Sequence, residues 1–328
     1  MRVLVTGATG FVGPHLVDHL RAEGDEVIVS EAEITNLETL ESDFARGSLD
    51  VVYHLAAQAD VQASFVDPAT TLRVNVEGTC NVLEAARRAG AGRVLMVSSA
   101  DVYGRVDPAD LPVTETAAMA PVSPYGASKA AAELVCVQAG LGRGLDVIRV
   151  RAFNHLGPGQ SDRFVAAALA SRVADNERNG SEAVRVGNLQ ARRDFTDVRD
   201  VVRAYRLLAE HGDAGEAFNV CSGASVSVAE LAERLVARAA HPMRLLSDGG
   251  LMRPADLLEM RGDPAKLRRA TGWRPQITLE ETLDNLLDHW RQRTPRARAA
   301  STGADGAAGA AAAEAAAVTR QPDPGDNH

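Results

Sequence analysis

Three glycines follow the first apolar run of this chain, and their position constrains the fold more than any other feature. Val3 to Val5 forms a strand-like run, and Gly7, Gly10 and Gly13 come next, at the start of a helical pattern over Phe11 to Ala22. Glycine permits a tight turn and lets backbone N–H groups at the positive end of a helix approach a pyrophosphate. The chain is therefore predicted to begin with a strand, a turn and a helix that bind a dinucleotide.

Short apolar runs alternate with longer helical patterns over the first half of the chain. The strand-like runs are Val27 to Val29, Val51 to Leu55, Val94 to Val97 and Val147 to Val150, and helical patterns cover Val74 to Arg88 and Pro124 to Gly140. Such alternation is typical of parallel strands buried under helices on both faces. We therefore predict an α/β fold built on a Rossmann-type, doubly wound parallel sheet, mainly within residues 1–155.

After residue 155 the alternation becomes irregular. Helical patterns cover residues 163–176, 198–210, 228–239 and 279–291, and strand-like runs cover 183–186 and 217–220. Thr278, with Glu281 three residues later, is an N-cap signal for the last helix. We interpret residues 156–293 as a smaller, partly interleaved substrate-binding lobe, some of whose strands return to the first sheet. Residues 294–328 contain almost no large apolar side chain, which predicts a disordered tail.

The composition excludes several classes of function. The 328 residues are 45% hydrophobic and 24% charged, and their net charge of −9 does not fit a nucleic-acid-binding surface. No stretch approaches the ~18 apolar residues of a membrane span, and the first residues enter a strand without signal-peptide architecture. We therefore expect a cytoplasmic protein with neither nucleic acid nor membrane as a partner.

The three cysteines, Cys80, Cys136 and Cys221, are far apart and follow no metal-ligand spacing. This usage fits a reducing cytoplasm. We interpret all three as buried apolar side chains, and we predict no metal site.

The end of the second strand carries the next candidate for binding a dinucleotide. Glu31 follows the apolar run at 27–29, where an acidic residue binds the ribose 2′-hydroxyl in such sites. No arginine occurs between Arg21 and Arg46 to hold a 2′-phosphate, although the Ser30 hydroxyl could hydrogen-bond such a phosphate. We predict NAD(H) or NADP(H) as the cofactor, with NAD(H) favoured. The competing interpretation of Glu31 is a solvated loop carboxylate.

Tyr125 and Lys129 stand four residues apart in a helical pattern, downstream of Ser99. That spacing places the phenol and the ammonium on one face of a helix, one turn apart. A fixed positive charge stabilises phenolate over phenol, so this tyrosine is expected to exchange a proton with a sugar hydroxyl or carbonyl near neutral pH. Taken singly, each residue also has an ordinary structural interpretation, as part of a helix surface or as a turn serine.

Five motifs together resemble one enzyme family. They are Thr6-Gly-x-x-Gly-x-x-Gly, His54-Leu-Ala-Ala, Asn75-Val-Glu-Gly-Thr, Ser98-Ser99-Ala-Asp-Val-Tyr-Gly and Tyr125-x-x-x-Lys129. In this order and spacing they resemble the extended short-chain dehydrogenase/reductases that act on nucleotide sugars, over residues 1–292. The resemblance implies that Tyr125 is the acid or base and that Lys129 lowers its pKa and holds the nicotinamide ribose. It also implies that Ser99 hydrogen-bonds the reacting sugar oxygen.

The same resemblance implies a cofactor site and a dimer. Residues expected to bind the cofactor are Gly7, Gly10, Phe11, Val12, Gly13, Glu31, Leu55, Ala56, Ala57, Asn75, Tyr125 and Lys129. Members of this family usually pair two helices from each subunit in a four-helix bundle. Small residues within 74–88 and 127–140 suit such close packing, so we expect a homodimer.

The carboxyl half resembles the branch of this family that acts on GDP-mannose. The matching segments are residues 151–160, 186–200, 219–223, 253–256, 262–266 and 272–275. Within that branch the likeness is to GDP-4-dehydro-6-deoxy-D-mannose reductases, which make GDP-D-rhamnose, and the GDP-mannose 4,6-dehydratases are the sister group.

The resemblance to the GDP-mannose branch also implies substrate contacts. Asp101 and Asn154 are expected to contact the substrate, with Asn154 on its phosphate side. Arg193 and Arg253 are expected to neutralise the GDP pyrophosphate through charge-assisted hydrogen bonds, with Arg192 as the alternative to Arg193 and a surface ion pair as the competing interpretation. Asp256 is expected to accept a hydrogen bond from the guanosine ribose.

Two residues beside Ser99 separate reduction from elimination. A 4,6-dehydratase must also remove a proton at C5 and expel the C6 hydroxyl, which calls for carboxylate chemistry next to the tyrosine. Here Ala100 cannot act as an acid. Asp101 is one methylene shorter than the glutamate typical of dehydratases, so its carboxylate is displaced by about an ångström, which matters in a preorganised site. The expected reaction is NAD(P)H-dependent reduction of the 4-keto group of GDP-4-dehydro-6-deoxy-D-mannose.

Three alternatives stay open from the sequence. The chain fits a GDP-mannose 4,6-dehydratase less well, and it fits a nucleotide-sugar 4-epimerase because Ser-Ser-Ala-x-Val-Tyr-Gly is also a pattern of UDP-sugar epimerases. A non-catalytic NAD-sensing regulator on the same fold is the third, against which the intact Ser99, Tyr125 and Lys129 argue. No motif decides between the rhamno and talo configurations at C4.

Overall fold

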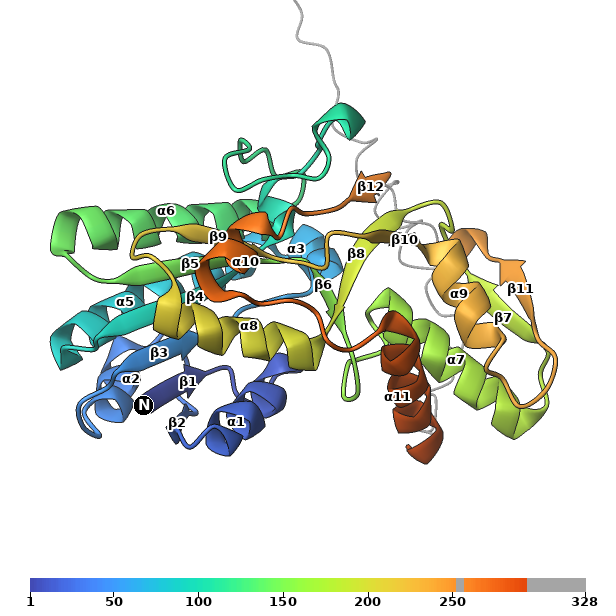
Figure 1. Ribbon diagram of the computed structural model, residues 1–328, viewed down its shortest axis with the longest axis horizontal. Coiled ribbons are helices and arrows are strands. Elements are labelled where there is room, and N and C mark those ends of the chain that lie inside the picture. The colour runs from blue at the N-terminus through green and yellow to red at the C-terminus, as the bar shows by residue number, and fades with distance from the viewer. Residues whose placement is uncertain (252–256, 294–328) are drawn as a thin grey trace, which may run out of the picture. The chain divides into compact units, whose positions relative to one another are not determined.

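Six parallel strands form the central sheet, in the order β2-β1-β3-β4-β5-β9 (Figure 1). The computed structural model describes residues 1–251 and 257–293. The six strands are β1 (Arg2–Thr6), β2 (Glu26–Ser30), β3 (Val51–His54), β4 (Arg93–Ser99), β5 (Val147–Ala152) and β9 (Ala217–Val220). Both β2 and β3 pair with β1, so the direction of winding reverses there. Ligands of such sheets bind at the carboxyl ends of the strands beside the reversal. The predicted α/β fold is confirmed.

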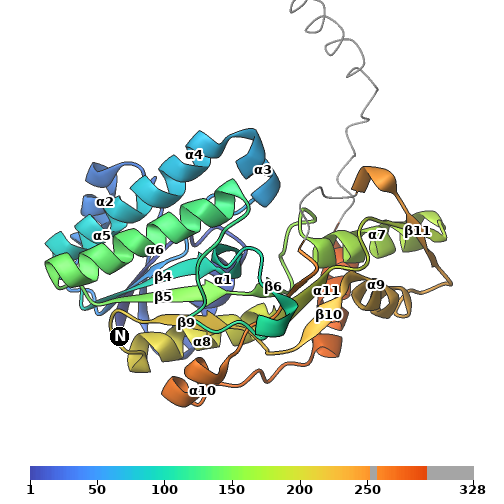
Figure 2. The ribbon, with the colours of Figure 1, turned by 90° about the horizontal axis from the view of Figure 1, so that it is seen from above.

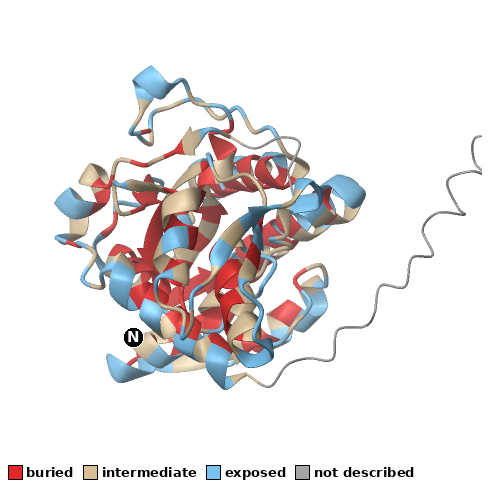
Figure 3. Ribbon diagram, turned by 90° about the vertical axis from the view of Figure 1, so that its right-hand side faces the viewer, coloured by how far each residue is buried: buried red, intermediate tan, exposed pale blue. Residues whose placement is uncertain are grey.

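Helices cover both faces of this sheet, as the alternation predicts (Figures 1 and 2). On one face α1 (Val12–Ala22) packs against α8 (Val198–His211). On the other face lie α2 (Leu37–Phe44), α5 (Gly78–Ala89) and α6 (Pro124–Arg143). The strands between the two helical layers are mostly buried (Figure 3). Burial on both faces explains why these strands appear in the sequence as continuous apolar runs.

The helical pattern expected over 74–88 is interrupted in the structure. α3 (Val61–Val66) and α4 (Pro68–Leu72) come first, and a π-helical turn, Arg73–Glu77, joins α4 to α5. The helix predicted over 74–88 is therefore present, but its first residues are π-helical and not α-helical. Asn75 lies within this wide turn, and its side chain hydrogen-bonds the Gln58 backbone and the Ser128 hydroxyl. Such turns occur frequently at functional sites.

The carboxyl half forms two smaller sheets with helices around them. β8 (Arg192–Asp197) pairs with β10 (Ser225–Ser227), β12 (Glu259–Met260) and β6 (Asn154–Leu156), and β7 (Ala183–Val186) pairs with β11 (Arg244–Ser247). α7 (Val165–Asn179), α9 (Val228–Val236) and α11 (Leu279–Gln292) share one apolar core. Thr278 caps α11 by accepting from the Glu281 N–H, as predicted. β9 pairs with β5, so a strand from this half completes the first sheet.

Two of the three cysteines are buried, Cys136 and Cys221. Cys80 is exposed, so the prediction of three buried thiols is wrong, because this residue lies on a surface of α5 that nothing in the described chain covers. Within residues 1–251 and 257–293, no helix has both the length and the apolar character needed to cross a membrane. The tail predicted to be disordered, 294–328, lies outside the described residues.

One buried carboxylate ties the segment before α11 to α8. Asp200 is 2% exposed and accepts hydrogen bonds from the backbone N–H groups of Gln276 at 2.8 Å and Ile277 at 2.9 Å. Its second oxygen accepts from Arg203 at 2.7 Å, and its backbone carbonyl accepts from the Trp273 indole at 2.9 Å. The link joins the last elements of the carboxyl half to the helical layer of the first sheet.

Replacement of Asp200 is expected to destabilise the whole chain. Asp200→Ala leaves two partly buried N–H groups and the Arg203 guanidinium without this carboxylate, and it should lower the free energy of unfolding by about 3 kcal/mol, measured by urea denaturation. Asp288→Ala is the matched control, because among the described residues Asp288 makes only an exposed pair with Arg291 on α11, and its loss should change the free energy of unfolding by less than about 0.5 kcal/mol. Equal losses for the two variants would contradict this account.

Candidate active site

The glycine turn after β1 is packed so closely that side chains do not fit. Gly7 has a φ of +72°, and a Cβ there would lie 2.5 Å from the Ala56 backbone nitrogen. A Cβ on Gly13 would lie 2.2 Å from the Ala8 carbonyl oxygen. Gly10 closes the turn by donating its N–H to the Gly7 carbonyl at 3.1 Å. The three glycines therefore bring the start of α1 against the end of β3.

The start of α1 offers N–H groups to an anion. Phe11 is the N-cap, and within the described residues no side chain accepts a hydrogen bond from the first turn, which contains no acidic residue. The first N–H groups of an α-helix lack partners inside the helix, and the helix dipole favours negative charge beside them. Together with the glycine cradle, Phe11, Val12 and Gly13 fit a dinucleotide pyrophosphate.

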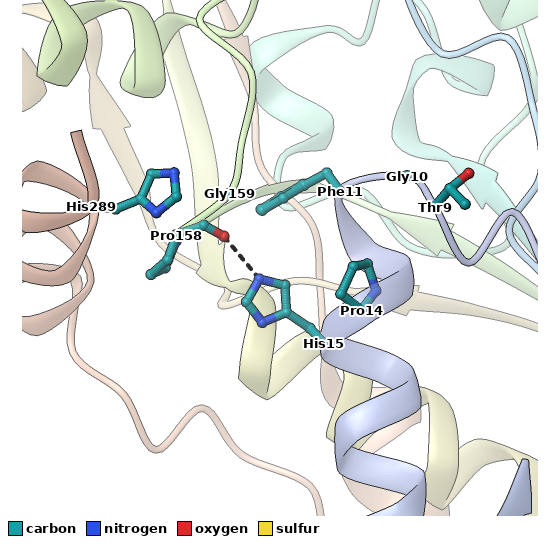
Figure 4. A pocket seen from close by; sticks show the side chains of 8 residues that line it. All are labelled: Thr9, Gly10, Phe11, Pro14, His15, Pro158, Gly159 and His289. Atoms are coloured by element: carbon teal, nitrogen blue, oxygen red, sulfur yellow. Dashed lines mark hydrogen bonds between the residues drawn. The ribbon is translucent and has the colours of Figure 1, made fainter. Parts of the chain in front are cut away.

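A pocket of about 350 Å³ lies beside this turn (Figure 4). Its lining residues are Thr9, Gly10, Phe11, Pro14, His15, Pro158, Gly159 and His289. The Phe11 ring stacks on His155, with 5.8 Å between ring centroids, and meets His15 edge-on at 5.7 Å. His15 Nε2 lies 2.9 Å from the Pro158 carbonyl oxygen. The pocket thus joins the glycine turn to the loop after β6 and to α11.

The end of β3 reaches the same turn. The His54 ring lies between the Thr6 hydroxyl, 2.8 Å from Nδ1, and the Thr79 hydroxyl, 3.1 Å from Nε2. Burial lowers the pKa of His54 to about 3, so the ring is neutral at physiological pH and braces β1, β3 and α5. Leu55, Ala56 and Ala57, which the sequence assigns to the cofactor, follow directly and are partly exposed.

The end of β2 leaves one candidate for the cofactor ribose. Glu31 is exposed just after the strand, as its predicted role requires. The Ser30 hydroxyl is buried and donates to the Asp43 carboxylate at 2.7 Å, and Arg46 forms an ion pair with the same carboxylate at 2.5 Å. The Ser30 hydroxyl, which the sequence offers to a 2′-phosphate, is therefore engaged inside the protein. Asn75 is likewise engaged, so its predicted contact with the cofactor stays a prediction.

Ser99, Tyr125 and Lys129 converge at the carboxyl end of β4. Ser99 ends β4 and accepts the Asp101 N–H at 3.1 Å. Tyr125 lies in the first turn of α6, which begins with the N-cap Ser123 and Pro124, and the Ser99 side chain is near enough to its phenol to influence the phenol pKa. Lys129 follows one turn later and donates its ammonium to the Val97 carbonyl at 2.8 Å. The structure thus brings the predicted catalytic residues together.

Burial shifts the two titratable groups of this cluster in opposite directions. It raises the pKa of Tyr125 well above its usual value, and the negative charge of Asp101 adds to this, while the Ser99 side chain opposes it. Burial lowers the pKa of Lys129 to about 8, because a charged amine loses its water. The sequence predicts a lowered pKa for Tyr125. In the structure, desolvation of the phenol raises this pKa and outweighs the effects that lower it. At pH 7 the phenol is protonated and the amine is charged.

Asp101 and Arg193 form the polar side of the cluster. Burial raises the pKa of the Asp101 carboxyl, and the positive charge of Arg193 on β8 opposes that rise. The Arg193 guanidinium donates to the Arg192 and Leu257 carbonyls, both at 2.8 Å. Arg192 turns the other way and donates to the Ser225 carbonyl at 2.9 Å. Of the two adjacent arginines, Arg193 is therefore the one directed at the catalytic residues.

The other predicted substrate residues are less closely joined to the cluster. Asn154 is exposed at the start of β6. Arg253 and Asp256 lie outside the described residues, so their roles stay predictions.

Sequence reasoning missed a buried ion pair behind the catalytic residues. Glu133, one turn after Lys129, is fully buried and accepts from Arg151 at 2.9 Å and from Ser98 at 2.6 Å. Two signals were present: arginines at alternate positions of a buried strand, and a lone glutamate on a helix of small residues. Lys129, by contrast, stands out in the sequence, because it and Lys266 are the only lysines among the 35 Lys and Arg residues.

Known proteins match this chain over most of its length. A family model described as GDP-mannose 4,6 dehydratase matches residues 28–286. A GDP-6-deoxy-D-mannose reductase from Pseudomonas aeruginosa is 41% identical over 300 residues, which cover 89% of this chain and 98% of that protein. The chain therefore belongs to the extended short-chain dehydrogenase/reductase family, among its NAD-dependent nucleotide-sugar epimerases, dehydratases and reductases.

Solved structures share the fold described above. The structure of RMD from Pseudomonas aeruginosa complexed with NADPH has a TM-score of 0.85 and 39% identity, over 89% of this chain and 99% of that one. The Thermus thermophilus UDP-glucose 4-epimerase complex with NAD has a TM-score of 0.81 and 31% identity, over 90% of this chain and 100% of that one. The predicted family is confirmed.

The shifted pKa of Lys129 can be measured directly because only two lysines occur. In a ¹³C-lysine NMR titration, with the Lys266→Arg variant to assign the signals, Lys129 should titrate near pH 8. The lowered pKa means that the buried charge costs stability below pH 8, and that this cost fades as the pH rises toward 10.5. A midpoint above pH 10 would contradict the burial argument.

Proposed function

We propose that this protein reduces the 4-keto group of GDP-4-dehydro-6-deoxy-D-mannose with NADH or NADPH and forms a GDP-6-deoxyhexose, GDP-D-rhamnose. One observation carries the proposal: a protonated Tyr125 and the Ser99 hydroxyl meet at one point, beside Ala100 where elimination would need an acid. The likeness to the Pseudomonas aeruginosa reductase supports the same reaction and substrate class.

The catalytic cluster supplies a proton and orients a carbonyl. When bound, the nicotinamide supplies the hydride that adds to C4. The C4 carbonyl oxygen accepts a hydrogen bond from Ser99 and takes the proton of the Tyr125 phenol as its negative charge develops. Lys129 carries a positive charge at pH 7 and stabilises the phenolate that remains. The raised pKa of Tyr125 suits this direction, since the phenol must begin protonated.

The cofactor would be held by the glycine turn. Gly7, Gly10 and Gly13 surround the uncapped start of α1, which would bind the pyrophosphate, and the exposed Glu31 would bind the adenosine ribose. The related structures contain NADPH in one case and NAD in the other, and both fit a site of this design.

Residues of the carboxyl half would bind the GDP part of the substrate. Arg193 combines a fixed position, given by two backbone carbonyls, with a charge directed at the catalytic residues. Such a guanidinium can neutralise a pyrophosphate through charge-assisted hydrogen bonds. Asp101 would accept from a sugar hydroxyl, and Asn154 would contact the phosphate side.

Incubation with GDP-4-dehydro-6-deoxy-D-mannose and either NADH or NADPH should consume the cofactor, with the product identified by NMR. Tyr125→Phe should lower kcat by about 100- to 10,000-fold, because the proton donor is lost. Tyr53→Phe is the matched control: it removes another buried hydroxyl, which hydrogen-bonds nothing in the described chain, and should leave kcat unchanged.

Each other outcome points to a different function. If the protein oxidises neither NADH nor NADPH, the proposed reductase activity is wrong. A 4-keto sugar released from GDP-mannose would favour the dehydratase, and interconversion of C4 epimers without net cofactor consumption would favour the epimerase. Cofactor binding without turnover of any 4-keto sugar would favour an NAD-sensing regulator.

We also propose that two copies of this chain pair through α5 and α6. Leu134 and Leu141 lie seven residues apart on α6, hence on one face, and are 59% and 88% exposed. α5 lies beside α6 (Figure 2), and Cys80 on α5 is exposed. Apolar side chains that gather on a surface mark a contact with a partner. An exposed thiol stays reduced in the cytoplasm, where we place the enzyme.

A charge within this surface should separate the subunits. Leu141→Glu buries a carboxylate in the paired state, which is costly, so light scattering should give the single-chain mass of 34.6 kDa while the unaltered protein gives twice that mass. Leu246→Glu, at an exposed leucine on β11, is the control and should leave the dimer intact. A single-chain mass for the unaltered protein would remove the proposal.

A further inference from the structure

A buried polar network lies directly behind the catalytic cluster. Glu133 on α6 has no exposed surface, and both of its oxygens accept hydrogen bonds from Arg151 on β5, at 2.9 to 3.2 Å. Arg151 is 4% exposed and also donates to the Tyr103 hydroxyl at 3.0 Å. Tyr103 in turn donates to Asn219 on β9 at 2.6 Å. The network thus links α6, β5, β9 and the segment after β4.

Glu133 also holds the strand that carries the reactive serine. Ser98, next to Ser99 in β4, donates its hydroxyl to Glu133 at 2.6 Å. Ser98 and Arg151 are paired in the register of β4 and β5, so both reach the same carboxylate from neighbouring strands. One turn earlier on α6, Lys129 donates to the Val97 carbonyl of β4 at 2.8 Å. Two successive turns of α6 are therefore bonded to two successive residues of β4.

This double attachment determines how far Ser99 lies from Tyr125. Tyr125 is one turn before Lys129 on α6, and Ser99 follows Ser98 on β4, so each reacting group lies just beyond the bonded pairs. At the same contact, a Cβ on Gly126 would lie 2.7 Å from the Asp101 carbonyl oxygen, so α6 already sits as close as the backbone allows. A small slip of α6 along β4 would separate the phenol from the serine hydroxyl.

A purely structural explanation of the ion pair is weak. The free-energy cost of removing two charges from water is about as large as the gain from their attraction. A buried Glu–Arg pair therefore seldom stabilises a fold more than apolar side chains of the same size. The pair does impose geometry, because the guanidinium fork and the carboxylate meet in one arrangement. Alignment of the groups it joins is a role that apolar side chains would not fill.

We propose that Glu133 is a positioning residue for the reduction: held by Arg151, it sets the register of α6 against β4 so that Tyr125 and Ser99 address the same substrate oxygen. It touches neither substrate nor cofactor and acts through Ser98 and through its own helix. This inference rests on the proposed function for the reaction itself, and on the bonds around Glu133 for the assignment.

Glu133 also contributes to the charge state of Lys129. The titratable groups facing Lys129 are Cys136 and Glu133 on α6 and His54 on β3, and Arg149 and Arg151 on β5 face Glu133. Glu133 opposes the fall that burial causes in the pKa of Lys129. Without this carboxylate, Lys129 should lose its proton at a lower pH.

The test compares Glu133→Gln with the unaltered full-length protein. The variant should lower kcat by about 10- to 100-fold while KM for sugar and cofactor stays within about twofold, since misplacement of about an ångström affects the reaction and not the binding. The alkaline limb of the kcat profile should move to lower pH. Ser98→Ala cuts only the bond to β4 and should lower kcat by about 3- to 10-fold by the same misplacement.

Asp200→Asn is the matched control, because it neutralises an equally buried carboxylate that is bonded to α8 and the 276–277 segment. It should lower the midpoint of urea denaturation and leave kcat and the pH profile unchanged. If Glu133→Gln behaves in the same way, the role of Glu133 is structural and the proposal falls. If that variant does not fold, an unchanged kcat for Ser98→Ala overturns the proposal.

A measurement that needs no catalytic turnover distinguishes failure of this inference from failure of the proposed function. If the unaltered protein reduces no 4-keto sugar, the proposed function fails, and the ¹³C-lysine titration still reports on Glu133. In Glu133→Gln the midpoint of Lys129 should fall below that of the unaltered protein. An unchanged midpoint would show that Glu133 does not act on the catalytic lysine.

Discussion

The burial of Lys129 under β4 is the interaction on which the site depends. An ammonium removed from water needs a partner, and the Val97 carbonyl supplies one at 2.8 Å. That bond, together with Gly126 against the Asp101 backbone, sets the first turns of α6 on the end of β4. Tyr125 meets Ser99 because of this contact. Burial also keeps the phenol protonated, and the amine stays charged at pH 7 because its lowered pKa, about 8, still lies above that pH.

The two ends of the site use opposite means to achieve precision. At the cofactor end, precision comes from missing side chains: a Cβ on Gly7 or Gly13 would overlap the backbone beside it, so the turn closes onto β3. At the catalytic end, precision comes from polar side chains whose burial costs free energy. Glu133 and Arg151 contribute alignment and little net stability. Such costs are common where catalysis, more than stability, determines the residues present.

The sequence predicts much of the fold and the central residues, because their signals are local. Apolar runs indicate the parallel strands, and the spacing of Tyr125 and Lys129 places them on one helical face. Local signals failed where a distant contact decides the outcome. The π-helical turn around Asn75 depends on Gln58 and Ser128, 17 and 53 residues away. The exposure of Cys80 depends on which face of α5 the sheet covers.

The class of reaction follows from short motifs, because the glycine turn, Ser99, Tyr125 and Lys129 each depend on the geometry of one turn or one helix. The tertiary structure set the environment of these residues. It selected Arg193 over Arg192, raised the pKa of Tyr125 where the sequence predicted a fall, and brought Glu133, Arg151 and Ser98 together from three elements. The physical reason is that burial, charge and register are properties of residues far apart in the chain, and no local pattern contains them.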